Sequence, residues 1–335
     1  MKEASHYTPL EGGQVRCGLC PHGCLIEPGE TGICLARTNR EGKLVSDNYG
    51  KVTSLHADPI EKKPFYHFSP GGKVLSAGSY GCNLKCSWCQ NAGISQSGNG
   101  HFASLPITYP EEILASLERF PFTGLAYTYN EPVVWFEYMR DVARLVRAAG
   151  RKNVVVSNGF INADPLEELM ELTDAFNIDL KAFSGEFYRR HTGGNLAAVL
   201  ETMGSIRRKG RHLEITFLVV GGLNDDAAAF REMLGWISGE LGNETILHIS
   251  RYHPAWQLHA PATPLDVMRR FYDMGREHLS FVYLGNAPQL KGTSDTFCPA
   301  CGIPAVERKG YHTDIKALDD SGRCMYCLEQ LPFAL

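Results

Sequence analysis

The pattern of hydrophobic and polar positions between about residues 73 and 285 alternates short apolar runs with longer amphipathic ones. Short runs rich in β-branched residues predict strands, and longer runs with helical periodicity predict helices. Several of the short runs are apolar throughout, which is typical of strands covered on both faces. The predicted strands span residues 73–79, 123–129, 153–158, 175–180, 213–220, 245–250 and 280–285.

Helices are predicted between these strands. Residues 110–120 begin with a proline and two acids, which favour a first helical turn, and residues 132–150 end at Gly150, a residue type suited to a helix end. The other predicted helices span 164–173, 195–210, 224–241 and 263–278. This alternation predicts an α/β fold built on a parallel sheet. Six or seven such units favour a partial barrel, whose chemistry gathers at the C-terminal ends of the strands.

The segments that flank this region have a different composition. Residues 1–50 are rich in glycine, cysteine and polar residues, and residues 291–335 contain two cysteine pairs in a loop-rich stretch. We therefore predict three parts: an N-terminal four-cysteine module (1–50), a partial barrel (51–290) and a C-terminal four-cysteine module (291–335).

The composition is that of an ordinary soluble globular protein, with 44% hydrophobic and 21% charged residues among 335. A formal net charge of −4 without a basic run argues against nucleic-acid binding. The first residues lack the apolar core of a signal peptide, and no apolar stretch reaches membrane-spanning length. We therefore expect a cytoplasmic protein that does not bind membranes.

The 11 cysteines fall into three groups, and none lies outside them. Cysteine clusters in a cytosolic protein more often bind metal than form disulfides, and buried structural cysteines would be scattered along the chain. The groups are Cys17, Cys20, Cys24 and Cys34; Cys82, Cys86 and Cys89; and Cys298, Cys301, Cys324 and Cys327.

The two outer groups each supply four thiolates, which suffice to close a metal site. The last group consists of two C-x2-C pairs separated by 22 residues, the spacing of a structural zinc ribbon. The first group has a less common spacing, C-x2-C-x3-C-x9-C. It could hold a structural zinc ion or a second iron–sulfur cluster that feeds electrons to the central group, and the sequence leaves both open.

The central group, Cys82, Cys86 and Cys89, follows the first predicted strand at C-x3-C-x2-C spacing. Three thiolates on a four-iron cluster leave one iron without a protein ligand, and that iron can hold a substrate or cofactor. A fragment of a zinc site is the alternative. It is disfavoured because no further Cys or His lies nearby, and His101 stands alone in a Gly/Ser-rich loop.

This spacing, with Trp88 directly before the last cysteine, resembles the signature of the radical SAM (S-adenosylmethionine) superfamily. The resemblance implies that the three cysteines hold a 4Fe–4S cluster, that SAM binds the open iron, and that Trp88 packs near the adenine. It further implies an oxidoreductase-type enzyme that cleaves SAM reductively to a 5′-deoxyadenosyl radical, which abstracts hydrogen from a substrate. The electron would come from a donor such as flavodoxin or ferredoxin.

The ends of the next two strands resemble SAM-binding segments of the same family. In "YTYNEP", Tyr129 and Asn130 stand where many members have two glycines, and Glu131 is retained. The resemblance implies contacts from Asn130 and Glu131 to the SAM amino group, although Glu131 could instead be an acid at a helix N-terminus. Ser157 and Asn158 could meet the SAM ribose or carboxylate, or form an Asn-Gly turn.

Three further strand ends carry candidate residues. Asp179 and Lys181 alternate on one strand and therefore share a face, as an ion pair or as part of a site. The resemblance favours the site. It also implies that backbone from Val219 to Gly221 lines the adenine, and that His253 reaches toward SAM, although a lone histidine is more often structural.

The matches between about residues 70 and 290 resemble the branch of pyruvate formate-lyase activating enzymes. The flanking segments and "TYNEP" closely resemble the radical SAM member of the AmmeMemoRadiSam system. That resemblance implies AMMECR-type and Memo-type partners. A glycyl-radical activase is one alternative function, and a non-catalytic iron–sulfur or zinc protein that carries electrons is another. RNA modification is disfavoured by the negative net charge.

Overall fold

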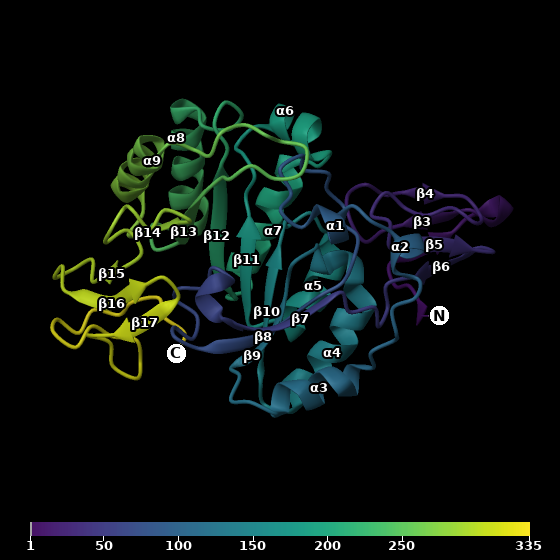
Figure 1. Ribbon diagram of the computed structural model, residues 1–335, viewed down its shortest axis with the longest axis horizontal. Coiled ribbons are helices and arrows are strands. Elements are labelled where there is room, and N and C mark those ends of the chain that lie inside the picture. The colour runs from purple at the N-terminus through teal and green to yellow at the C-terminus, as the bar shows by residue number, and fades with distance from the viewer. Residues whose placement is uncertain (1) are drawn as a thin grey trace.

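The computed structural model describes residues 2–335, and its centre is an eight-stranded sheet in the order β14-β13-β12-β11-β10-β9-β8-β7 (Figure 1). All seven predicted strands are present, and each pairs in parallel with its neighbours from β8 to β14. The sheet is a partial barrel, with β7 and β14 at its edges. The strands are β7 (Ser54–Pro59), β8 (Lys73–Gly78), β9 (Gly124–Tyr127), β10 (Lys152–Ser157), β11 (Ala175–Asp179), β12 (His212–Val219), β13 (Ile246–Arg251) and β14 (Phe281–Gly285).

Helices connect the strands, and every helix that the sequence predicts is present. Their apolar faces pack on the sheet in one continuous core. Gly150 has a φ of +71° just after α4, where the chain must turn back toward β10. The helices are α1 (Ala92–Ser95), α2 (Asn99–Phe102), α3 (Pro110–Glu118), α4 (Phe136–Ala148), α5 (Ala163–Leu172), α6 (Gly185–Phe187), α7 (Leu196–Arg208), α8 (Ala227–Trp236) and α9 (Leu265–His278). None of these helices is long and apolar enough to cross a membrane.

Strand β7 is absent from the sequence-based assignment. It pairs antiparallel with β8, from Ser54 opposite Gly78 to Pro59 opposite Lys73. Half of its six residues are exposed and only Asp58 is buried, so it lacks the apolar run that marks the buried strands. An exposed edge strand is defined by its backbone pairing, which leaves little trace in the hydrophobic pattern.

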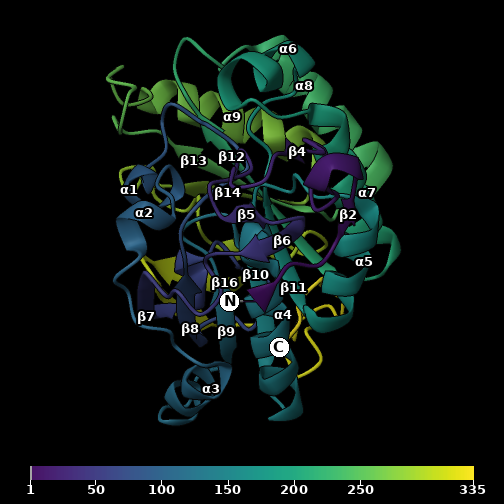
Figure 2. The same ribbon diagram turned by 90° about the vertical axis from the view of Figure 1, so that its right-hand side faces the viewer.

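The N-terminal module packs against α4 and shares the core of the barrel. It lies to the right in Figure 1 and in front of the sheet in Figure 2. Arg37 and Glu137 form a fully buried ion pair, and Lys2 Nζ lies 2.8 Å from Asp141 Oδ2. The three-part division of the chain stays a prediction. The module contains β1 (Lys2–Glu3), β2 (Tyr7–Pro9), β3 (Val15–Cys17), β4 (Leu25–Ile26), β5 (Arg37–Arg40) and β6 (Lys43–Ser46).

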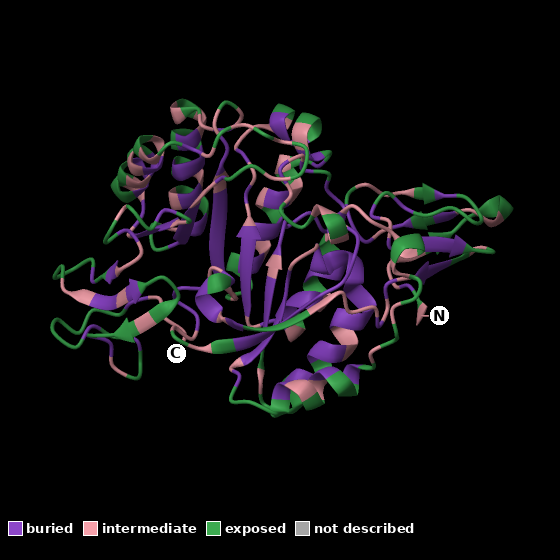
Figure 3. Cartoon of the chain, viewed as in Figure 1, coloured by how far each residue is buried: buried purple, intermediate pink, exposed green. Residues whose placement is uncertain are grey.

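The C-terminal module lies at the opposite side of the sheet, against the beginnings of β13 and β14 (Figure 1). Its Val306 and Leu318 pack with Ile246 and Phe281, the first residues of those strands. Figure 3 shows that the central strands are buried, whereas the module's hairpins carry many exposed residues. Its strands are β15 (Thr296–Phe297), β16 (Pro304–Lys309) and β17 (His312–Ile315).

A buried carboxylate, Glu214 of β12, organises the same end of the barrel. It accepts hydrogen bonds from the backbone N–H of Tyr66 and His67, at 3.0 and 2.9 Å. His212 Nε2 and His248 Nε2 lie 2.9 and 2.5 Å from its oxygens. Burial alone would raise the pKa of Glu214, but the two histidines hold it well below its usual range. An ionised acceptor thus joins the segment before β8 to β12 and β13.

Replacing Glu214 with Gln should lower the free energy of unfolding by on the order of 3 kcal/mol at pH 7, because an amide cannot accept from all four donors. Urea denaturation measures the loss, and the exposed Glu232→Gln is the matched control, with a change within about 0.5 kcal/mol. Since the folded pKa of Glu214 is depressed, its stabilisation is complete above about pH 4.3 and is lost as the pH falls further. Equal stability of the two variants would contradict this role.

Candidate functional site

The loop that carries the central cysteines, residues 81–91, follows β8 at the C-terminal end of the sheet. Its backbone is held by distant segments. The N–H of Cys82 donates to Cys34 O at 3.2 Å, Lys85 N–H to Thr192 O at 2.8 Å, and Gln257 N–H to Ser87 O at 3.1 Å. The conformation of this cysteine loop therefore depends on three remote parts of the chain.

The spacing of the sulfur atoms separates the cysteine groups. The C-terminal cysteines form a compact group, with all their sulfur atoms within 4.8 Å of one another. No other group of three or more potential ligands within residues 2–335 is this compact. Among the sulfurs of Cys82, Cys86 and Cys89, at least one pair therefore lies more than 4.8 Å apart. Ligands of one tetrahedral zinc ion, with bonds of about 2.3 Å, lie about 3.8 Å apart. Thiolates that bind different irons of a cluster lie farther apart, so the central group fits a cluster.

Burial governs the ionisation of the central thiols. It raises the pKa of Cys86 to about 11, and it raises the pKa of Cys82 well above its usual range, where Glu131 adds to the effect. Thiols in such surroundings ionise when a metal replaces the proton. The donor set therefore fits a bound metal cluster.

Glu131 connects the ends of β9 and β10. Its Oε1 accepts from Val133 N–H at 3.0 Å and from Ser157 Oγ at 2.7 Å. Its Oε2 accepts from Asn158 N–H at 2.8 Å. Burial raises the pKa of Glu131 to about 7, against the lowering effect of these donors. Both carboxylate oxygens of Glu131 thus accept hydrogen bonds from the protein itself. The bond from Val133 N–H is the helix N-terminal contact that the sequence allowed as an alternative role.

Asn158 brings the end of β10 to the cysteine loop. Its Nδ2 donates to Asn83 Oδ1 at 2.9 Å and lies 3.8 Å from Cys82 Sγ. Its Oδ1 accepts from Phe160 N–H at 2.9 Å, a local contact of the Asn-Gly turn. Asn158 is therefore both a turn residue and a neighbour of a candidate metal ligand.

Asp179 and Lys181, at the end of β11, form an ion pair with Nζ 2.7 Å from Oδ2. Burial opposes the charge of Lys181, but Asp179 and Cys86 raise its pKa above its usual range. The charge of Lys181 in turn offsets part of the rise that burial causes in the pKa of Cys86. The two residues share a face, as the sequence predicts. Both also interact electrostatically with Cys86.

The remaining predicted contact residues are Trp88, within the cysteine loop, and residues at the ends of β12 and β13. Trp88 is buried and packs on Phe187 with ring centroids 5.6 Å apart. Val219 O accepts from Thr263 Oγ1 at 2.5 Å. A Cβ at Gly221 would meet no atom within 4 Å, so open space adjoins the end of β12. His253 is exposed in the loop after β13.

Sequence reasoning missed a set of hydrogen bonds that fixes both ends of the cysteine loop. Asn130 Oδ1 accepts from Ser79 N–H, and its Nδ2 donates to Gly81 O, both at 3.0 Å. Asn91 Nδ2, just past the last cysteine, donates to Tyr129 O at 2.7 Å. The departure from the Gly-Gly pattern was the available signal, because two larger residues at a strand end need partners of their own.

Tyr129 has a φ of +75°, an uncommon conformation for a residue with a side chain. Its hydroxyl donates to Asp58 Oδ2 at 2.8 Å, and Lys63 Nζ lies 4.4 Å from the ring centroid. Lys63 also pairs with Asp58 at 2.8 Å. These contacts with β7 and the turn after it hold Tyr129 in its strained conformation.

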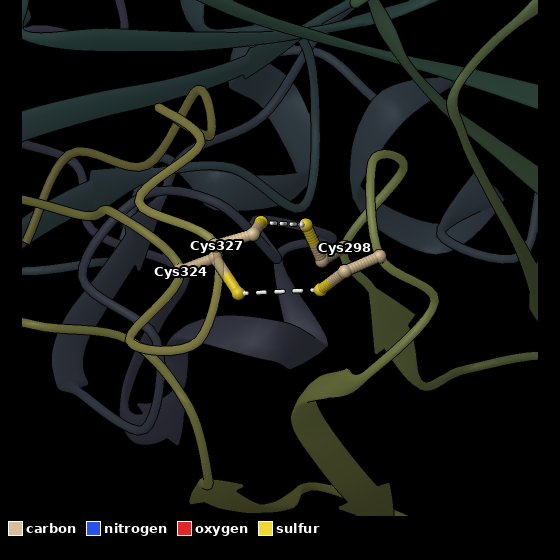
Figure 4. Close-up of side chains that lie close together, drawn as sticks. Cys298, Cys324 and Cys327 are labelled. Carbon is tan, nitrogen blue, oxygen red and sulfur yellow. Dashed lines mark hydrogen bonds between the residues drawn. The ribbon is translucent and has the colours of Figure 1, made fainter.

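The C-terminal cysteines form a compact four-sulfur group (Figure 4). Cys298 Sγ lies 3.5 Å from Cys327 Sγ, and Cys301 Sγ lies 3.6 Å from Cys324 Sγ. These separations are close to the 3.8 Å or so expected for thiolates on one tetrahedral ion.

Comparison with protein families identifies the central part of the chain. The model of the radical SAM superfamily matches residues 77–237, from β8 to the helix after β12. The chain belongs to the radical SAM superfamily. Membership implies a 4Fe–4S cluster and SAM, and the cysteine loop lies within the matched region.

Individual relatives extend the match beyond the radical SAM core. Uncharacterized protein MJ0808 of Methanocaldococcus jannaschii is 39% identical over 338 residues and covers 100% of both chains, terminal modules included. The pyruvate formate-lyase 1-activating enzyme of Escherichia coli is 26% identical over 181 residues, which cover 52% of this chain and 71% of that enzyme. A solved radical SAM methyltransferase from Sphaerobacter thermophilus has a TM-score of 0.50 at 15% identity, covering 65% of this chain and 67% of its own. The last match shows a shared fold.

Replacing Asn130 with Ala should lower the apparent affinity for cluster iron about 10- to 100-fold, because the loop loses the side chain that joins Ser79 to Gly81. Iron retention after anaerobic reconstitution measures the effect. Exposed Asn243, at the opposite end of the sheet, provides the control variant Asn243→Ala. If Asn130 only contacted SAM, iron retention would match the control.

Proposed function

We propose that this protein is a radical SAM enzyme in which Cys82, Cys86 and Cys89 hold the 4Fe–4S cluster and SAM binds the open iron. The observation that carries the proposal is the widely spaced group of three cysteines at the end of the first parallel strand, inside the region that matches the superfamily. When bound, the cluster would supply the electron that cleaves SAM to methionine and a 5′-deoxyadenosyl radical.

The residues around the loop have complementary roles in this proposal. Asn158 and Lys181 place a donor and a positive charge next to Cys82 and Cys86, which stabilises thiolate charge. Glu131 orients Ser157 and Asn158 toward the SAM ribose or carboxylate. Asn130 keeps the loop in place.

SAM itself would occupy the space along the strand ends. The open space at Gly221 and the backbone from Val219 would receive the adenine, near Trp88. Asp179 would face the amino acid part of SAM. His253, on the loop whose Gln257 N–H donates to Ser87 O, would reach toward SAM.

Replacing Cys86 with Ala should abolish the release of 5′-deoxyadenosine from SAM under anaerobic, reducing conditions, because two thiolates remain for the cluster. Product is measured by liquid chromatography, with circular dichroism to show that the variant is folded. Release at the wild-type rate would contradict the proposed function.

The substrate belongs to one of two classes. A glycyl residue of a partner enzyme is supported by the similarity to the E. coli activating enzyme. A partner-protein side chain or a small molecule, handled with AMMECR-type and Memo-type proteins, is supported by the resemblance of the flanking segments. Incubation with each partner, followed by glycyl-radical EPR and mass spectrometry, separates the two. Either reaction needs a one-electron donor such as flavodoxin or ferredoxin, and free thiol clusters suit the reducing cytoplasm.

We also propose that the C-terminal cysteines hold a structural zinc ion, based on sulfur separations of 3.5 and 3.6 Å. Replacing Cys301 and Cys327 with Ala should remove one zinc per chain and leave the iron content unchanged, because the module lies at the far end of the strands. Metal analysis by mass spectrometry measures both. Loss of iron together with an unchanged zinc content would show that the site holds a cluster.

A further inference from the structure

The four N-terminal cysteines approach one another from two loops of their module. The N–H of Cys17 donates to Cys24 O at 2.9 Å, so the segment between them forms a hairpin with Cys20 in its turn. The second loop contains Cys34. A Cβ on Gly32 of that loop would lie 3.9 Å from Cys24 Sγ.

These thiols converge without the close packing of a single-ion site. Within residues 2–335, three or more ligand atoms within 4.8 Å of one another occur in the C-terminal group alone. Among any three of the N-terminal sulfurs, at least one pair therefore lies more than 4.8 Å apart. The chain thus contains one compact group that suits a single metal ion, at the C-terminus. The N-terminal group is less compact, which suits thiolates that bind different irons of one cluster.

A buried cation adjoins the N-terminal thiols. Arg37 is 1% exposed, and its Nη1 lies 3.8 Å from Cys17 Sγ. Its Nη2 pairs with Glu137, while its Nε is buried and has no hydrogen-bond partner among the described residues. Four thiolates around a cluster carry a net negative charge, which a guanidinium with an unused donor stabilises.

The N-terminal cysteines are connected directly to the cysteine loop. The N–H of Cys82 donates to Cys34 O at 3.2 Å, and His22 Nε2 lies 2.7 Å from Asn83 O. Gly81 has a φ of +86°, and a Cβ there would lie 2.5 Å from Cys34 O. A glycine is needed at this position for the two backbones to approach so closely. Cys24, by contrast, is only partly buried, so this edge of the group faces solvent.

We propose that Cys17, Cys20, Cys24 and Cys34 bind a second 4Fe–4S cluster, which passes electrons from a low-potential one-electron donor protein to the cluster at Cys82, Cys86 and Cys89. In each transfer the donor is oxidised by one electron, the N-terminal cluster is reduced and reoxidised, and the central cluster is reduced by one electron. No bond or proton changes place. Electron transfer to the central cluster rests on the proposed function, whereas cluster binding at the N-terminal cysteines stands independently of it.

The decisive experiment uses the full-length triple variant Cys82→Ala, Cys86→Ala and Cys89→Ala, which leaves every N-terminal residue in place. After anaerobic reconstitution, the wild type should hold roughly eight irons and the triple variant roughly four, with an EPR signal on reduction by dithionite. The companion variant Cys17→Ala/Cys20→Ala should retain the roughly four irons of the central cluster. A triple variant with two zincs and no iron overturns the proposal. Release of 5′-deoxyadenosine by the wild type would still support the radical SAM function.

The proposed electron transfer has its own readout. Two reduced clusters joined through the Cys34 to Cys82 hydrogen bond should interact magnetically. The EPR spectrum of the fully reduced wild type should therefore differ from the sum of the spectra of the triple variant and the Cys17→Ala/Cys20→Ala variant. A spectrum equal to that sum overturns the close approach of the two clusters on which the proposed electron transfer rests.

Discussion

The arrangement of the cysteine loop depends on the close backbone contact between Gly81 and Cys34. A loop of this length has many accessible conformations, and a metal site needs one of them. The hydrogen bond from Cys82 N–H to Cys34 O, at 3.2 Å, restricts the start of the loop, and Asn130 and Asn91 restrict its two ends. These contacts are made within the protein, so they reduce the conformational entropy that cofactor binding would have to remove.

Three charged groups that are buried or partly buried have partners that fit their place in the fold. Arg37 joins Glu137 between the N-terminal module and α4, and Lys181 joins Asp179 at the strand ends. Glu214 has four donors at the other end of the barrel. A buried ion without a partner is costly, so these pairs restrict how the modules and strands can pack.

The two ends of the parallel strands serve different purposes. The C-terminal ends bring the cysteine loop, Asn158 and Lys181 together, as the barrel topology requires of functional residues. The N-terminal ends of β13 and β14 carry the compact C-terminal cysteine module. A metal ion bound there, as we propose, would contribute to folding, because the four sulfurs leave no ligand position for a substrate.

The sequence alone determined the parallel strands, the helices and the three cysteine groups, because hydrophobic periods and cysteine spacings are local properties of a chain. It also placed Asp179 and Lys181 on one face, since side chains alternate along a strand. Tertiary structure decided the pairing of β7 and the use of Asn130 and Glu131 as internal links, because their partners lie far away in the chain. It also distinguished the compact C-terminal sulfurs from the wider central and N-terminal groups. Distances between thiols from separate loops depend on how those loops pack, which the spacing of cysteines along the sequence does not record.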